Sequence, residues 1–298
     1  RARYPDADCY VDRDGVRIHY EVHGSGDPTV MLIPSSPITH SRSWKGQIPY
    51  LARHFRVVTM DGRGSGRSDR PVAVETHSRE ENIADILAVM DAAGVDSPVL
   101  VAHCHANWWA VELAASYPDR VRALIAIEPG VPYLSSPNPN WVASAESFDQ
   151  VLENPSGWQL FNRHVITNEY RRWLEFFFTQ QLVEPHSTKQ FEDMVGWGLE
   201  STGEVLVAGE LGQEVRPPER EEFEELCRAL ELPILVIHGE LDPCQLVGRG
   251  RAFADVVGAE LVTLEGVGHL PHGREPVKVN RLIKDFVDRI GAGTEVSA

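Results

Sequence analysis

The chain has 298 residues, 42% hydrophobic and 24% charged, and a chain of this length buries about three quarters of the surface that its unfolded form exposes. Its 28 Lys and Arg against 44 Asp and Glu give a net charge of −16, which argues against nucleic acid or an anionic membrane as a partner. The four cysteines, at 9, 104, 227 and 244, have neither CxxC nor metal-ligand spacing, and every apolar run is far too short to span a membrane. We therefore expect a protein of the reducing cytoplasm that needs no disulfides or structural zinc.

Strand-like and helical segments alternate along the chain, a pattern typical of a parallel sheet with crossover helices. A hairpin comes first, with Asp14-Gly15 between two alternating segments in residues 9–22. Strands are predicted next at 29–34, 55–61, 98–104 and 121–129, and after a long gap at 233–242 and 259–266. The first four of these runs are nearly continuously apolar, as expected where helices cover both faces of a sheet. Residues 1–130 and 230–298 are therefore predicted to form one α/β domain that ends in a helix at 276–290.

Residues 131–229 interrupt this alternation. They are rich in Trp and Phe and have helical rather than strand periodicity. We expect a helical cap inserted into the α/β domain, placed over the carboxyl ends of the strands, where the active sites of such sheets lie. Most of its aromatic side chains are expected to form the core of the cap, and some to line a pocket.

The segment 98–110 (PVLVAHCHANWWA) predicts a buried strand that turns directly into an amphipathic helix. Cys104 lies at the turn, and the small residues Ala102 and Ala106 lie two positions to either side of it. This is the pattern of a nucleophile elbow, in which strand and helix come close and the central side chain projects above the sheet. The usual pattern is Gly-x-Ser-x-Gly, whereas this chain has Ala-His-Cys-His-Ala, with cysteine at the nucleophile position.

At this motif the chain resembles the α/β-hydrolase family, and the resemblance extends over nearly its whole length. Three further motifs carry it. DGRGSGRSDRP (61–71) is similar to the family's loop after an early parallel strand, GELDP (239–243) to the turn that bears the acid, and EGVGHLPHGREP (265–276) to the histidine loop. Their order is that of the family: nucleophile, acid, histidine. The resemblance implies an α/β-hydrolase fold, mostly parallel, with helices on both faces and a helical cap.

Carried over to this chain, the resemblance assigns Cys104 as the nucleophile, His269 as the general base and acid, and Asp242 as the residue that orients the imidazole. Glu128 is a second candidate for the acid, because it ends the strand after the elbow, where some relatives carry theirs. The GELDP motif favours Asp242. His272, three residues beyond His269, is expected to be structural or to line the rim of the site.

An acyl-enzyme mechanism also requires hydrogen-bond donors for the oxyanion. We predict the backbone N–H of His105 as one donor and Ser35 or Ser36 as the other. These serines lie in the loop after the strand at 29–34, where many relatives have His-Gly-x-Pro and this chain has Pro-Ser-Ser-Pro. The sequence has no GxGxxG, GK[ST] or HExxH pattern, so it implies no cofactor and no metal.

Cysteine nucleophiles in this family pass through a thioester, whereas its dehalogenases and epoxide hydrolases use an aspartate. The leading hypothesis is therefore a hydrolase of esters, lactones or thioesters with an apolar or aromatic acyl group. An acyltransferase with the same acyl-enzyme stays open, as do a cofactor-free lyase and a non-catalytic ligand-binding protein. Replacement of an original serine or aspartate by Cys104 is a further alternative, and a homo-oligomer also stays open.

Overall fold

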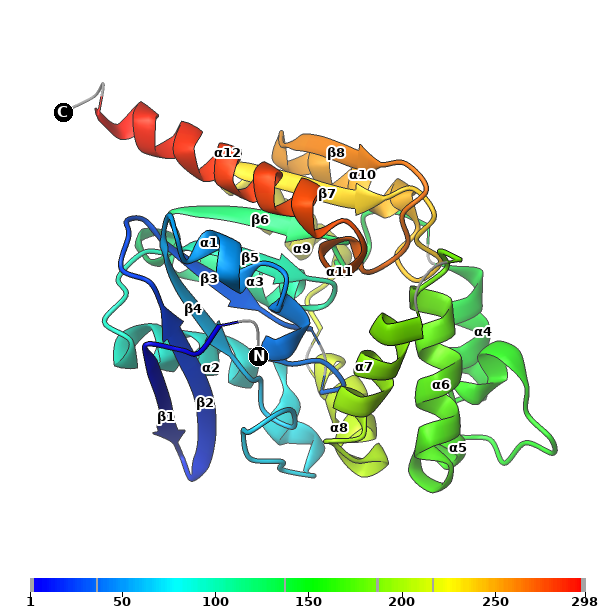
Figure 1. Ribbon diagram of the computed structural model, residues 1–298. Helices are drawn as coiled ribbons and strands as arrows, with labels where there is room; N and C mark the ends of the chain where they lie inside the picture. The colour runs from blue at the N-terminus through cyan, green and yellow to red at the C-terminus, as the bar shows by residue number, and fades with distance from the viewer. Residues whose placement is uncertain (1–2, 36, 137, 186–187, 216, 296–298) are drawn as a thin grey trace.

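The computed structural model describes residues 3–295, except 36, 137, 186–187 and 216. Within these residues the chain forms an eight-stranded sheet of order β1-β2-β4-β3-β5-β6-β7-β8 (Figure 1). The strands are β1 (Ala7–Arg13), β2 (Val16–His23), β3 (Thr29–Ile33), β4 (Arg56–Met60), β5 (Val99–His103), β6 (Ala123–Ile127), β7 (Ile234–Gly239) and β8 (Glu260–Leu264). β3 to β8 pair in parallel, and β2 joins β1 and β4 antiparallel at one edge. The predicted mostly parallel sheet is confirmed.

The hairpin at this edge turns at the predicted residues. Arg13 pairs with Val16, and the two residues between them, Asp14 and Gly15, have φ values of 54° and 83°. Two consecutive positive φ angles give the tight turn whose twist matches that of the flanking strands, and Asp-Gly is a preferred sequence for it.

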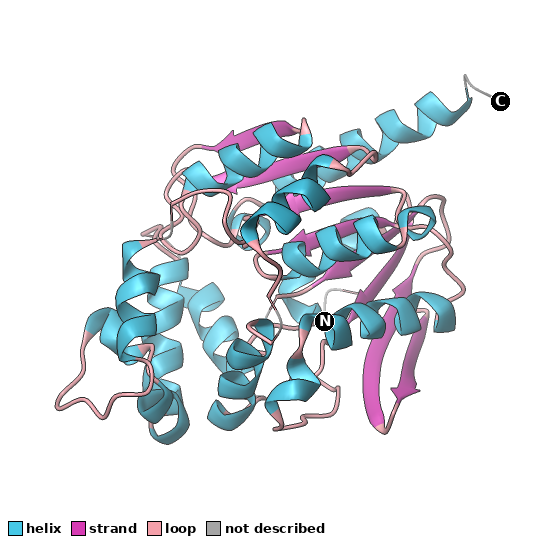
Figure 2. Ribbon diagram, turned by 180° about the vertical axis from the view of Figure 1, so that it is seen from behind, coloured by secondary structure: helices cyan, strands magenta, loops and turns pink. Residues whose placement is uncertain are grey.

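Helices cover both faces of the sheet. On one face lie α2 (Arg79–Ala92), α3 (Ala106–Ser116), α9 (Arg220–Arg228) and α10 (Val247–Val257), which are in front in Figure 2. On the other lie α1 (Ile48–Leu51) and α12 (Pro276–Glu295). Successive side chains of a strand point to opposite faces, so Met31 packs in the first core and Leu32 in the second. Short connecting helices are η1 (Ser41–Trp44), η2 (Val74–His77), η3 (Pro118–Arg120) and α11 (Pro271–Arg274).

The segment after β6 forms the cap, which lies on the side toward which the arrowheads of β6 and β7 point (Figure 1). Its helices are α4 (Pro139–Ser147), η4 (Gly157–Leu160), α5 (Arg163–Asn168), α6 (Tyr170–Gln181), α7 (Thr188–Gly198) and α8 (Gly203–Gln213). Aromatic side chains dominate its core; the rings of Trp173 and Phe177, for example, stack at 4.8 Å. Of the predicted insertion 131–229, the last helix behaves differently: Phe223 and Cys227 of α9 pack in the core of the α/β domain.

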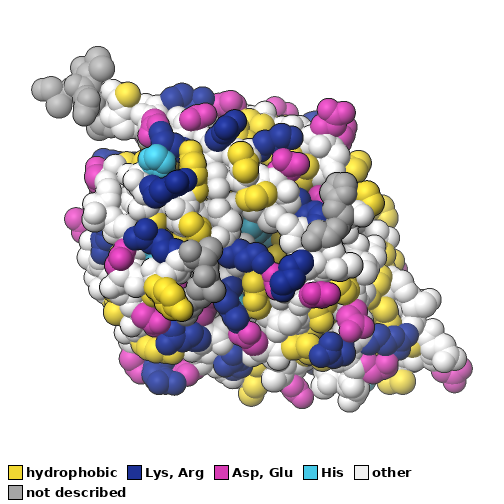
Figure 3. Space-filling view, viewed as in Figure 1, with side chains coloured by type: hydrophobic (Ala, Val, Ile, Leu, Met, Phe, Trp, Pro, Cys, Tyr) yellow, Lys and Arg dark blue, Asp and Glu magenta, His cyan; other side chains and the backbone are white. Residues whose placement is uncertain are grey.

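The surface mixes side chains of all kinds. On the face shown in Figure 3, Lys and Arg are interspersed with Asp and Glu. Among the residues described, no helix combines the length and the apolar character that a membrane span requires. All four cysteines are free, and three of them, Cys104, Cys227 and Cys244, are buried.

Candidate functional site

Cys104 occupies a sharp turn between β5 and α3. Its φ is 51°, which few residues other than glycine adopt, and such strained positions cluster at functional sites. Four hydrogen bonds hold the turn: the Cys104 N–H donates to the Ile127 carbonyl at 3.0 Å, and the Cys104 carbonyl accepts from the Gly130 N–H at 3.1 Å and from the N–H and Nδ2 of Asn107, both at 3.0 Å. The sulfur is thereby held at the carboxyl end of the sheet.

Close packing around the turn explains its small residues. Ala102 and Ala106 are both fully buried. A Cβ added to Gly130 would lie 2.9 Å from the carbonyl carbon of Cys104 and 3.0 Å from the His105 nitrogen. Only glycine fits at 130 without moving the elbow, so the segment after β6 supports the turn at Cys104 directly.

His269 lies in the loop between β8 and α11 and contacts Asp242 from the turn after β7. His269 Nδ1 is 2.7 Å from Asp242 Oδ2. The other carboxylate oxygen, Oδ1, accepts from the N–H groups of Cys244 at 2.7 Å and Gln245 at 3.0 Å. Both oxygens are thus occupied, which fixes the carboxylate and the imidazole, and His269 lines one small pocket together with Cys104.

The charges around His269 favour its protonated form. Burial opposes a charge on the ring, but the Asp242 carboxylate, which is hydrogen-bonded to it, and the neighbouring Cys104 raise the pKa of His269 to about 10. The ring is therefore an imidazolium at neutral pH, paired with the Asp242 carboxylate. An imidazolium in this position can protonate a leaving group.

Glu128, the second candidate acid, contacts Asp242 instead of His269. Its Oε1 accepts from the Gly239 N–H at 2.6 Å, and its side chain is completely buried. Burial and the neighbouring Asp242 carboxylate raise the pKa of Glu128 well above its usual range. Burial also opposes the charge of Asp242, but the charge and hydrogen bond of His269 lower its pKa. Glu128 therefore keeps its proton, and its Oε2 lies 2.8 Å from His238 Nε2. Of the two carboxyl groups, Asp242 is the one that contacts the imidazole of His269.

Two further histidines support the loop that carries His269. His103 Nε2 donates to the His269 carbonyl at 3.0 Å, and its ring lies 4.7 Å from that of His272. The His272 ring in turn lies 4.5 Å from that of Trp44. Burial lowers the pKa of His272 to about 3 and that of His103 well below its usual range, so both are neutral. His272 is a buried packing residue. The contact of His103 with the His269 loop was not predicted, because the position of His103 next to Cys104 in the sequence does not show which loop lies against it.

Two of the three residues predicted as oxyanion donors, His105 and Ser35, line the same small pocket as Cys104. The His105 N–H, at the start of α3, has no hydrogen-bond acceptor among the residues that the structure describes. Ser35 is buried and lines a small pocket of about 30 Å³ together with Cys104 and His269. Ser36 lies outside the described residues. The roles of all three in catalysis stay predictions.

A larger cavity continues from this pocket beneath the cap. It has a volume of about 470 Å³ and shares His105, Trp141, Glu210 and Gln245 with the pocket at Cys104. Its apolar wall is aromatic, formed by Trp108, Trp141, Phe148 and Phe161. The cap thus encloses the approach to the sulfur, and three of its aromatic residues belong to the cavity as well as to the cap's own core.

The sequence analysis did not predict three polar residues of the cavity, Glu210, Gln245 and Arg249. Burial, and then the charge of Glu214, raise the pKa of Glu210 to about 7. Among the described residues, Glu210 has no hydrogen-bond or ion-pair partner, and Arg249 bonds to the side chain of Gln245 but to no carboxylate. Nothing in the local sequence distinguishes these three from the many charged and amide residues of surface helices.

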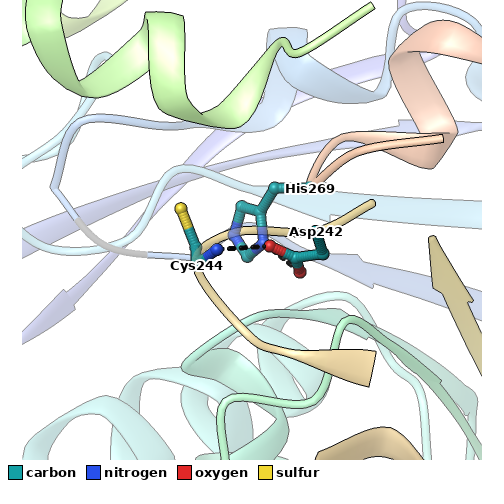
Figure 4. Close-up of side chains that lie close together, drawn as sticks. All are labelled: Asp242, Cys244 and His269. Atoms are coloured by element: carbon teal, nitrogen blue, oxygen red, sulfur yellow. Dashed lines mark hydrogen bonds and ion pairs between the residues drawn. The ribbon is translucent and has the colours of Figure 1, made fainter. Parts of the chain in front are cut away.

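One cluster in the site has the donor atoms of a metal centre. Ligand atoms of Asp242, Cys244 and His269 lie within 4.8 Å of one another (Figure 4). However, His269 Nδ1 and Asp242 Oδ2, which a metal would need, already bond to each other at 2.7 Å. The arrangement fits a hydrogen-bonded acid and imidazole better than a metal site, and we assign no metal to it.

Comparison with known proteins agrees with this geometry. A sequence model described as "alpha/beta hydrolase fold" matches residues 23–276. Epoxide hydrolase 1 of Caenorhabditis elegans is 25% identical over 290 residues, 94% of this chain and 70% of the relative. Bifunctional esterase/perhydrolase DCH of Acinetobacter calcoaceticus is 26% identical over 286 residues, 92% of this chain and 96% of the relative.

Other similarities are shorter or confined to the fold. Two vertebrate epoxide hydrolases match over 122 and 132 residues, which are 34% and 22% of their own lengths. The crystal structure of the enol-lactonase from Burkholderia xenovorans LB400 superposes with a TM-score of 0.76 at 19% identity, covering 94% of this chain and 100% of that one. This last likeness shows the shared fold.

Proposed function

The chain belongs to the alpha/beta hydrolase fold family, and from this membership we propose that it hydrolyses an ester, lactone or thioester through Cys104, His269 and Asp242. The observation that carries the proposal is the pairing of His269 with Asp242 at 2.7 Å beside a cysteine held at positive φ on a strand-to-helix turn. Nucleophile, imidazole and orienting acid are the three parts of a catalytic triad.

In the proposed acylation step, the Cys104 thiolate attacks the carbonyl carbon of the substrate. A C–S bond forms, and the negative charge that develops on oxygen is stabilised by the His105 N–H and by a donor from the loop at Ser35. The bond to the leaving group then breaks, and the leaving group takes a proton from the His269 imidazolium. The product of this step is a thioester on Cys104 and a neutral His269.

In the proposed second step, water attacks the thioester. Neutral His269 accepts a proton from this water as the C–O bond forms. The C–S bond breaks, its electron pair returns to sulfur, and the free acid leaves. The thiolate and imidazolium are thereby restored for the next turnover.

The cavity supports an apolar or aromatic acyl group as the substrate. Its aromatic wall adjoins the pocket at Cys104, and pockets of this size commonly bury most of a small ligand. Two relatives named above are an esterase/perhydrolase and an epoxide hydrolase. A cysteine at 104 favours the ester reaction, since epoxide hydrolases of this fold use an aspartate there.

We favour water over another acceptor for the acyl group, and the cytoplasm as the location. Cys104 is only 8% exposed and lies beneath cap residues Trp141 and Phe177, a setting that favours a small acceptor over a large carrier. A reducing compartment would keep Cys104 and the other three free cysteines from being oxidised.

Intact-mass measurement after incubation with a panel of activated esters, lactones and thioesters tests the proposal. We expect one substrate to add its acyl mass to the wild-type protein and none to Cys104→Ala. Cys104→Ser should turn over about 10²-fold more slowly or worse, because it keeps the elbow but loses the thiolate. Equal turnover in the serine variant would contradict a cysteine nucleophile. Turnover that needs an added amine or thiol, and that yields the amide or thioester instead of the free acid, would indicate an acyltransferase.

A further inference from the structure

Gln245 has a backbone that is fixed on both sides. It lies in the turn after β7, three residues beyond Asp242, and is 3% exposed. Its N–H donates to Asp242 Oδ1 at 3.0 Å, and its carbonyl accepts from His238 Nε2 at 2.6 Å. The side chain therefore starts from a rigid point inside the site.

The side-chain amide of Gln245 bridges a cation and the nucleophile. Arg249 Nη1, one turn further along on α10, donates to Gln245 Oε1. Gln245 Nε2 lies 3.7 Å from Cys104 Sγ, within hydrogen-bond range for sulfur. A guanidinium can only donate, so the amide oxygen must face Arg249 and the amide NH₂ must face the sulfur. Arg249 thus determines the orientation of the amide.

Several charged or titratable groups surround the sulfur. They are His269 after β8, Asp242 and Cys244 in the turn after β7, Glu128 after β6, His103 and His105 beside Cys104, Glu210 on α8 and Arg249 on α10. His269 is the one that exchanges a proton with the substrate in the proposed mechanism. The Gln245 amide has no proton to exchange at any ordinary pH, so its contribution is a fixed hydrogen bond.

We propose that Gln245 is a further catalytic residue, which donates a hydrogen bond from Nε2 to the Cys104 sulfur, and that Arg249 is a positioning residue that orients the Gln245 amide. The inference rests on Cys104 as the proposed nucleophile. A hydrogen bond to a charged acceptor is stronger than one to a neutral acceptor, so this bond stabilises the thiolate relative to the thiol. It also stabilises the sulfur as it regains its electron pair when the C–S bond of the thioester breaks.

Alkylation by iodoacetamide measures the thiolate without any acyl substrate. The sulfur electron pair forms the S–C bond and iodide leaves with the electrons of the C–I bond. The rate is followed on the Cys104 peptide by mass spectrometry, which separates it from Cys9, Cys227 and Cys244, and it is recorded from pH 5 to pH 10. Thiolate absorbance at 240 nm, with Cys104→Ser subtracted, gives a second reading.

Two variants of Gln245 separate loss of the donor from other effects. Gln245→Met has a similar length but no donor, and Gln245→Glu keeps an acceptor for Arg249. We expect both to move the alkylation profile by about one pH unit toward alkaline pH, which is about tenfold in the rate on its rising part. An unchanged profile in both variants would overturn the proposal, as would a shift in Gln245→Glu alone, because added negative charge would then explain it.

A double-mutant cycle tests the part assigned to Arg249. Arg249→Met should shift the profile in the wild-type background and have no further effect in Gln245→Met. An equal shift in both backgrounds would show a direct effect of the Arg249 charge and overturn the positioning role. Arg251→Met, an exposed arginine on the same helix, is the matched control. Because no acyl group takes part, failure of acyl labelling with an intact alkylation shift would contradict the proposed function alone.

Discussion

The cluster of Asp242 and His269 and the cavity beneath the cap differ in how far their polar groups are hydrogen-bonded. In the cluster, both oxygens of Asp242 accept hydrogen bonds, and His269 Nδ1 bonds to one of them at 2.7 Å. In the cavity, Glu210 has no partner among the described residues, and Arg249 reaches only an amide. The difference indicates that the cluster is organised before substrate arrives, whereas the cavity keeps polar capacity that a substrate can use.

The two carboxyl groups of the cluster should differ most in their effect on turnover. Asp242→Asn removes the charge that holds the imidazolium, and we expect kcat to fall about 10³-fold or more. Glu128→Gln keeps a neutral hydrogen-bonding group of the same size behind Asp242, so its loss should stay within about tenfold. Steady-state kinetics of both variants measures the contrast. A larger loss in Glu128→Gln than in Asp242→Asn would identify Glu128 as the functional acid.

The elbow should tolerate no side chain at Gly130. A Cβ there would meet Cys104 and the His105 nitrogen at 3.0 Å or less, so Gly130→Ala should displace the predicted oxyanion donor and lower kcat by about 10²-fold. Gly248→Ala is the matched control, because an added Cβ meets nothing within 4 Å there. Activity near the wild-type value in Gly130→Ala would mean that the turn is not as tightly organised as its contacts indicate.

The aromatic wall should determine selectivity rather than the chemical step. Phe148 lines the cavity, whereas Phe176 packs against Trp158 at 5.6 Å in the same cap and does not line it. Phe148→Ala should lower kcat/KM for an aromatic acyl ester about tenfold and leave that for an acetyl ester nearly unchanged, since only the larger group loses apolar contact. Phe176→Ala should not alter the ratio of the two esters. If both variants change that ratio equally, the wall acts through the stability of the cap.

The unpartnered Glu210 should have a small and pH-dependent effect on stability. Its pKa of about 7 lies above the ordinary value, so the folded state gains relative to the unfolded state at low pH and loses that gain as the pH rises through about 7. Glu210→Gln cannot ionise, and we expect its Tm to exceed the wild-type Tm by about 2–6 °C at pH 8 but not at pH 5. Thermal unfolding at both pH values measures this. The exposed Glu221→Gln should show no such difference, and a constant offset for Glu210→Gln would contradict an ionisation effect.

The sequence by itself determined the sheet and the elbow. Nearly continuous apolar runs predicted the strands at 29–34, 55–61, 98–104 and 121–129, because strands covered on both faces must be apolar throughout, and alternation around Asp14-Gly15 predicted the hairpin. The small residues around Cys104 predicted the turn for a similar reason, since strand and helix approach too closely there for larger side chains. Both features depend on a few neighbouring residues, which a sequence displays directly.

Only the tertiary structure decided which side chains meet at the site. Glu128 and Asp242 follow the adjacent parallel strands β6 and β7, in which Ile127 pairs with Ile237, so both carboxyl groups emerge at the same edge of the sheet. Which of the two carboxyl groups contacts the imidazole depends on the conformations of the turns, and the spacing of residues in the sequence does not show these. In the same way, Glu210 enters the cavity through the packing of a cap helix, and Gln245 faces the sulfur through its bond to Arg249. Contacts between distant segments depend on the geometry of the whole assembled fold, and local sequence patterns carry no record of it.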